Sequence, residues 1–71
     1  MRNIIDSTVI RILKGRIGQD SPHAVVVGEV IKQIDLFQAQ PPAVKERIES
    51  LIEGGYIKRQ QNNRNNYEYI A

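Results

Sequence analysis

The stretch from Ile5 to Lys14 has an apolar pattern with the period of an amphipathic helix. At about 100° per residue, its apolar side chains at spacings of three and four fall on one side, and these are Ile5, Val9, Ile12 and Leu13. Lys14 then lies roughly 155° from the centre of this stripe, with Ser7 and Arg11 beside it and Ile10 at its flank. The sequence therefore predicts a helix that is buried on one side and holds Lys14 toward solvent.

A chain of 71 residues is long enough for one small domain with one core. It contains no cysteine, which excludes disulfides, thiolate zinc sites and a cysteine nucleophile. The single histidine, His23, has no second ligand at metal spacing, so we expect a surface or capping residue. No apolar run approaches the ~18 residues of a membrane span, and no nucleotide-binding or metalloprotease motif occurs. We expect a non-catalytic domain with no cofactor, no metal and no membrane segment.

The first half of the chain predicts two helices. The first is expected over residues 2–16, where Asn3 or Asp6 offers an acceptor to the free N–H groups at its start. Gly15 and Gly18 weaken its end, since glycine disfavours a helix by up to about 1 kcal/mol. A turn over residues 18–22 leads to a second helix over residues 25–36, preceded by one or two extended residues. The apolar face of this helix consists of Val27, Val30, Ile31, Ile34 and Phe37.

The second half predicts one more helix and a hairpin. A third helix is expected over residues 42–53, because Pro42 suits a first helical position and two glycines follow Glu53. Its inner face consists of Val44, Ile48, Leu51 and Ile52. Strands are expected over residues 56–59 and 67–70, joined by an asparagine-rich turn over residues 60–66. Three helices followed by a C-terminal β-hairpin wing predict an α+β fold, the winged helix, over residues 1–71.

The distribution of charge bears on what such a fold binds. A DNA-binding winged helix commonly inserts its third helix into the major groove and contacts phosphates with the wing. Residues 42–54 carry two cations and three carboxylates, net −1, whereas residues 56–70 carry three cations and one carboxylate, net +2. Residues 2–17 are the most basic, with four cations and one carboxylate, net +3. Because phosphate attraction dominates nucleic-acid affinity, this pattern favours a protein-facing role, and nucleic-acid binding stays the alternative.

The segment from Ile5 to Lys14 resembles the segment around the modified lysine near the C-terminal end of cullins. The similarity continues through every later element, in His23, Gly28-Glu29-Val30, Ile34, Phe37, Val44-Lys45, Ile48-Glu49, Leu51-Ile52-Glu53, Tyr56-Ile57, Arg59 and Tyr67-Glu68-Tyr69-Ile70-Ala71. The resemblance implies the terminal winged-helix (neddylation) domain of a longer scaffold protein of RING ubiquitin ligases. It also implies that Ala71 is the natural C-terminus and that the protein is found in cytoplasm and nucleus.

The same resemblance implies a modification site. Lys14 matches the lysine that receives a ubiquitin-like modifier through an isopeptide bond, which switches the ligase on, and Ile10, Arg11 and Arg16 would form the flanking recognition surface. The implied partners are the RING subunit, the modifier and its conjugating enzyme, the signalosome protease that removes it, and the rest of the cullin chain. The sequence offers no base beside Lys14, so we expect an acceptor and not a catalyst. A docking domain with an unmodified Lys14 stays a further alternative.

Overall fold

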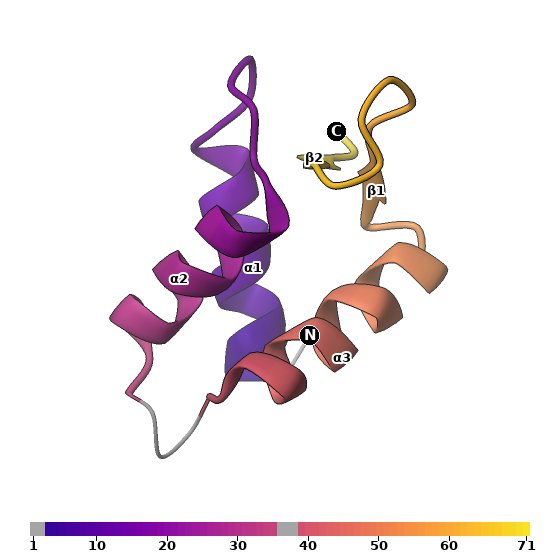
Figure 1. The fold of residues 1–71 in the computed structure, drawn as a ribbon. Coiled ribbons are helices and arrows are strands. Elements are labelled where there is room, and N and C mark those ends of the chain that lie inside the picture. Colours follow the sequence, from indigo (N-terminus) through magenta and orange to yellow (C-terminus); the bar gives the residue numbers. More distant parts are fainter. Residues whose placement is uncertain (1–2, 36–38) are drawn as a thin grey trace.

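The computed structural model describes residues 3–35 and 39–71. They form α1 (Ile4–Lys14), α2 (His23–Gln33) and α3 (Pro41–Glu53), followed by β1 (Ile57–Arg59) and β2 (Tyr67–Tyr69). The two strands are antiparallel, and Ile57 pairs with Tyr69 while Arg59 pairs with Tyr67. Figure 1 shows the three helices crossing one another, with the hairpin beyond the C-terminal end of α3 and β2 turned toward α1. The prediction of three helices followed by a hairpin wing is confirmed.

The core lies between the three helices and the hairpin. Every residue predicted for the inner face of the first helix is buried, and Val9, Val44 and Ile48 have no exposed surface at all. Ile31 and Ile52, which were predicted to face inward, are only half-buried. Val26 is fully buried although the predicted face omits it, and Phe37 lies outside the described residues. The apolar period therefore locates the core, which is what fixes α1 and the wing against each other.

The first helix is shorter than predicted at both ends. Asn3 is the N-cap, because its Oδ1 accepts hydrogen bonds from the backbone N–H groups of Ile5 at 2.8 Å and Asp6 at 3.4 Å. At the other end the helix stops at Lys14 and not at residue 16, with Gly15 as C-cap. Lys14 is therefore the last residue of α1, immediately before the chain turns away.

The second helix begins earlier and ends earlier than predicted. Pro22 is extended and bridges to Asn66, and the backbone N–H of His23 donates to the carbonyl of Asn65 at 2.9 Å. These contacts hold Pro22 extended against the wing turn, and α2 starts at the next residue, His23. Residues 23 and 24 are therefore helical, and the prediction that they are extended is wrong. Ile34 has φ −113° and ψ 136°, which ends the helix at Gln33 and not at residue 36. Tertiary contacts thus decide boundaries that the local sequence leaves open.

Asp6 has a structural role in place of the predicted capping role. Its buried carboxylate accepts two hydrogen bonds from Arg47 of α3, from Nε at 2.7 Å and from Nη2 at 2.6 Å. Hydrogen bonding to Asp6 raises the pKa of the Arg47 guanidinium above its ordinary value. The pair has the bidentate geometry that makes arginine–carboxylate contacts strong, and it fixes the N-terminal half of α1 to α3.

A second polar network fixes the wing. The hydroxyl of Tyr67 lies 2.7 Å from Nδ1 of His23, and the Arg59 guanidinium lies over the Tyr67 ring. Arg59 also donates to both carboxylate oxygens of Glu49 on α3, which lowers the pKa of that carboxyl. Burial raises the pKa of the Tyr67 phenol above its ordinary value. Residues of α2, α3, β1 and β2 thus meet in one chain of contacts, and His23 is half-buried at its end.

Candidate functional site

Lys14 is exposed at the C-terminal end of α1. Its Nζ lies 5.2 Å from the centre of the Tyr69 ring, within the range of a cation–π interaction. Within residues 3–35 and 39–71 Lys14 forms no salt bridge, whereas Lys58 pairs with Glu68 at 3.3 Å. Its ammonium is therefore held by an aromatic face and not by a carboxylate.

The Lys14 side chain stands at the rim of an open groove between α1 and the wing. The groove has a volume of about 490 Å³ and is lined by Ser7, Ile10, Arg11, Lys14, Gly55, Tyr56, Tyr69 and Ile70. Tyr56 is 52% exposed and Ile70 is 38% exposed, so large apolar side chains gather beside the lysine. The groove therefore offers apolar area directly beside an exposed amine.

The turn after α3 gives the groove its second wall. Gly55 has φ +82°, in the left-handed region that a side chain rarely adopts. The backbone N–H of Tyr56 then donates to the carbonyl of Leu51 at 3.0 Å, and Ile70 donates to the carbonyl of Tyr56 at 3.2 Å. The double glycine of the sequence therefore ends α3 sharply and brings Tyr56 beside the C-terminal strand.

Two of the three predicted flanking residues share the groove with Lys14. Ile10 is half-buried, and Arg11 lines the groove while its Nη2 donates to Oε1 of Gln33 at 2.6 Å. Arg16 is turned the other way, where its Nε donates to Oγ of Ser21 at 2.9 Å and its Nη2 donates to the Asp20 carbonyl at 2.6 Å. The structure thus places Ile10 and Arg11 with Lys14, and Arg16 with the loop that follows.

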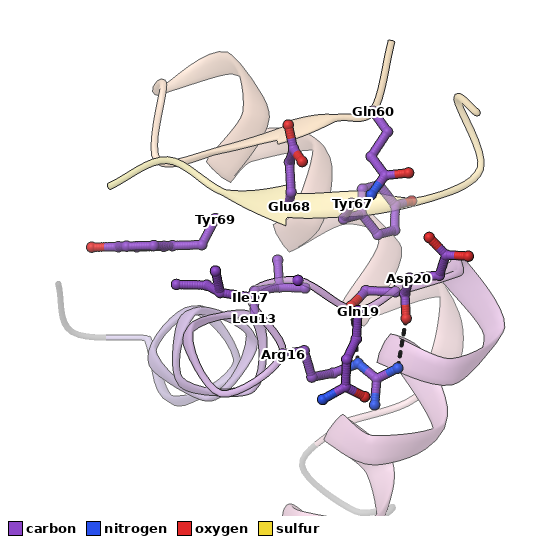
Figure 2. A pocket seen from close by; sticks show the side chains of 11 residues that line it. Leu13, Arg16, Ile17, Gln19, Asp20, Gln60, Tyr67, Glu68 and Tyr69 are labelled. Atoms are coloured by element: carbon purple, nitrogen blue, oxygen red, sulfur yellow. Dashed lines mark hydrogen bonds between the residues drawn. The ribbon is translucent and has the colours of Figure 1, made fainter. Parts of the chain in front are cut away.

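Figure 2 shows the cavity to which Arg16 belongs. It has a volume of about 240 Å³ and lies between the loop before α2 and strand β2. Tyr69 lines this cavity together with Leu13 and Ile17, and it also lines the groove of Lys14. The ring of Tyr69 therefore separates the two hollows.

Sequence reasoning missed the wing residues of the groove, namely Tyr56, Tyr69 and Ile70. The available signal was the alternation in the last strand, since Tyr67 and Tyr69 are two residues apart and share one face of the hairpin. The pairing of that face with α1 is a tertiary contact, which the strand pattern alone does not reveal.

Three of the five cations of α3 and the wing form ion pairs within the chain, while Lys45 and Arg64 are exposed. Arg47 pairs with Asp6, Arg59 with Glu49, and Lys58 with Glu68. These are residues of the helix and hairpin that a DNA-binding winged helix turns toward phosphates. Their intramolecular pairing weighs against the nucleic-acid alternative.

The described residues also bear on metal binding and on membrane spanning. No group of three or more histidine, aspartate or glutamate side chains in the described part of the chain is arranged to hold a metal ion. Across those same residues, no helix has the length and apolar character to cross a membrane.

Comparison with known proteins identifies the family. A family model described as the cullin protein neddylation domain matches residues 2–63. The chain belongs to the cullin family. It is 43% identical over 68 residues to Cullin-3 of Dictyostelium discoideum and 40% identical over 68 residues to Cullin-3B of Arabidopsis thaliana. It is 39% identical over 67 residues to human Cullin-4A, and each match covers 94% of this chain. The resemblance drawn from the sequence is confirmed.

A solved structure is similar to the whole fold. It concerns a dual E3 mechanism for Rub1 ligation to Cdc53 and contains Dcn1(P) and the WHB domain of Cdc53. The match has a TM-score of 0.78 and 34% sequence identity, and it covers 94% of this chain and 76% of the other. The winged-helix prediction is thereby confirmed. The chain spans only 9% of the length of the Dictyostelium and Arabidopsis relatives and 8% of human Cullin-4A.

Proposed function

We propose that this domain accepts a ubiquitin-like modifier on Nζ of Lys14, as the terminal domain of a longer cullin scaffold in a RING ubiquitin ligase. The observation that carries the proposal is the placement of Lys14, which is the last residue of α1 and is exposed at the rim of an apolar groove. Membership of the cullin family, through a match to its neddylation domain, supports the same chemistry.

In the proposed reaction Lys14 is the nucleophile. The neutral amine attacks the carbonyl carbon of the thioester that joins the modifier to its conjugating enzyme. A C–N isopeptide bond forms, the C–S bond breaks, the cysteine leaves as thiolate, and the nitrogen loses one proton. Neither a carboxylate nor a histidine lines the groove, so the base belongs to the conjugating machinery. In this proposal Lys14 is the acceptor, and the conjugating machinery supplies the catalysis.

The groove beside Lys14 is the proposed docking surface for that machinery. Tyr56 and Ile70 offer exposed apolar area, and Ile10 extends it along α1. A surface of this kind, next to the acceptor, lets the conjugating enzyme and the RING subunit bring a thioester to the amine. The attached modifier then changes the surface of the scaffold at the end of α1, which is how it switches the ligase on until the signalosome protease removes it.

The test is a reconstituted modification of the full-length cullin that carries this domain. The reaction contains the modifier, its activating and conjugating enzymes and a RING subunit, and intact mass reads the product. We expect one modifier mass on the wild type, none on Lys14→Arg, and an unchanged adduct on the control Lys45→Arg, an exposed lysine of α3. An unmodified wild type, under conditions that modify another cullin, would contradict the proposal.

A further inference from the structure

The lysines of the chain have different electrostatic partners. Lys32 lies 4.0 Å from Glu29 and Lys58 lies 3.3 Å from Glu68, so carboxylates hold both. Among the described residues, Lys14 is the lysine whose ammonium lies over an aromatic ring, with Nζ 5.2 Å from the ring centre of Tyr69. The residue that is proposed to be modified is thus held differently from Lys32 and Lys58.

Tyr69 is itself firmly placed. It pairs with Ile57 in the hairpin, and Ile57 is only 1% exposed. The half-buried ring packs against the core and lines both the Lys14 groove and the neighbouring cavity, of which Figure 2 shows the cavity. A fixed ring beside the groove gives the exposed Lys14 side chain a defined direction.

This direction has a kinetic consequence. A lysine side chain has many rotamers, and ordering it costs conformational entropy. A contact that orders the amine before the thioester arrives lowers the entropic barrier to attack.

We propose that Tyr69 is a positioning residue for modification, whose ring holds the Lys14 amine at the rim of the groove. The inference rests on the proposed function of Lys14. The bonds made and broken stay the same, since the isopeptide bond still forms as the thioester C–S bond breaks and the amine proton leaves. Tyr69 affects the rate of that step.

Nuclear magnetic resonance tests the contact without any enzyme. In the 71-residue chain, the ε-methylene protons of Lys14 are expected to carry a ring-current shift from Tyr69. Tyr69→Leu should abolish the shift and Tyr69→Phe should keep it. If Tyr69→Leu leaves these resonances where they are, the contact does not exist in solution and the inference is overturned.

Kinetics tests the role in the reaction. With the full-length cullin at saturating concentration, Tyr69→Leu should lower kcat by about two- to fivefold, the factor that a cation–π contact at an exposed site supplies. KM should change less than kcat, and Tyr69→Phe should restore the wild-type kcat. Tyr69→Ile, with a strand-favouring side chain, replaces Tyr69→Leu if circular dichroism shows that the leucine variant does not fold.

The outcomes separate this inference from the proposed function. Modification at Lys14 with an unchanged or higher kcat in the leucine or isoleucine variant overturns only the role of Tyr69. A loss confined to KM does the same, because it describes a docking residue. A wild type that is not modified at Lys14 overturns both.

Discussion

The two ends of α1 carry charged residues in opposite settings. Near the start, Asp6 is 4% exposed and its carboxylate is bound by two nitrogens of Arg47. At the end, Lys14 is exposed, pairs with no carboxylate of the described residues, and lies over the ring of Tyr69 beside an open groove. One end fastens the helix to α3, and the other presents an amine on that fixed support.

Under the proposed function, the two ends of one helix separate stability from reactivity. A charge that must hold the fold is paired and buried, because an unpaired buried charge is expensive. A charge that must react stays accessible, and an aromatic face holds it without covering it. A helix of only 11 residues meets both needs because its two ends have different neighbours.

The largest effect is expected from a comparison of two adjacent residues at the C-terminal end of α1. Leu13 is 2% exposed in the core, so Leu13→Ala should lower the free energy of unfolding by about 2–5 kcal/mol. Lys14→Ala removes an exposed side chain and should change it by no more than about 0.5 kcal/mol. Urea unfolding followed by circular dichroism measures both. Equal losses at the two positions would contradict the separation of stability from reactivity.

A smaller loss is expected at the fastened end. Asp6→Asn keeps the shape of the side chain but leaves the Arg47 guanidinium without its carboxylate, which should cost about 1–3 kcal/mol of unfolding free energy. Glu29→Gln is the matched control, because Glu29 belongs to an exposed pair with Lys32 at 4.0 Å and exposed pairs contribute little. The same urea experiment applies. A control that loses as much as Asp6→Asn would show that the buried pair does not fasten α1.

The smallest effect concerns the wing. The hydrogen bond from Arg59 lowers the pKa of Glu49 below its ordinary 4.5 in the folded protein. The unfolded chain therefore takes up this proton first, so the contribution to stability is present above about pH 4.5 and is lost as the pH falls through the folded pKa. The wild type should lose more unfolding free energy between neutral and acid pH than Glu49→Gln does. The difference should be no more than about 1 kcal/mol, because the pair is partly exposed.

Unfolding midpoints between pH 3 and pH 7 measure this, with Glu53→Gln as the control from the same helix. Parallel pH profiles for wild type and Glu49→Gln would show that the pair does not link the wing to α3.

Much of the fold was predictable from the sequence because apolar period and breakers are local signals. The buried face of α1 and the exposed position of Lys14 follow from helical spacing, and the order of elements follows from the helix and strand patterns with the glycines, prolines and asparagines between them. The start of α2 at His23 was not predictable from the sequence, because it depends on contacts with the wing turn. Pro22 bridges to Asn66, and His23 donates to Asn65. Local propensity cannot reveal a boundary that a distant loop decides.

The candidate site was predictable only in part. Lys14, Ile10 and Arg11 share one helix, so their proximity follows from spacing alone. Arg16 was grouped with them, but α1 ends at Lys14 and the Arg16 side chain binds the following loop. Tyr69 was missing from the predicted surface, because its ring reaches Lys14 only through the packing of β2 on α1.

The most direct test of the account asks whether the modifier selects the end of α1 or any exposed lysine near it. Peptide mapping after modification would compare wild type, Lys14→Arg and the double variant Arg11→Lys/Lys14→Arg, which moves the amine one turn back along the same helix. The account predicts an adduct on Lys14 in the wild type and none in either variant. An adduct on Lys32, Lys45 or Lys58, or full modification of the double variant, would contradict it.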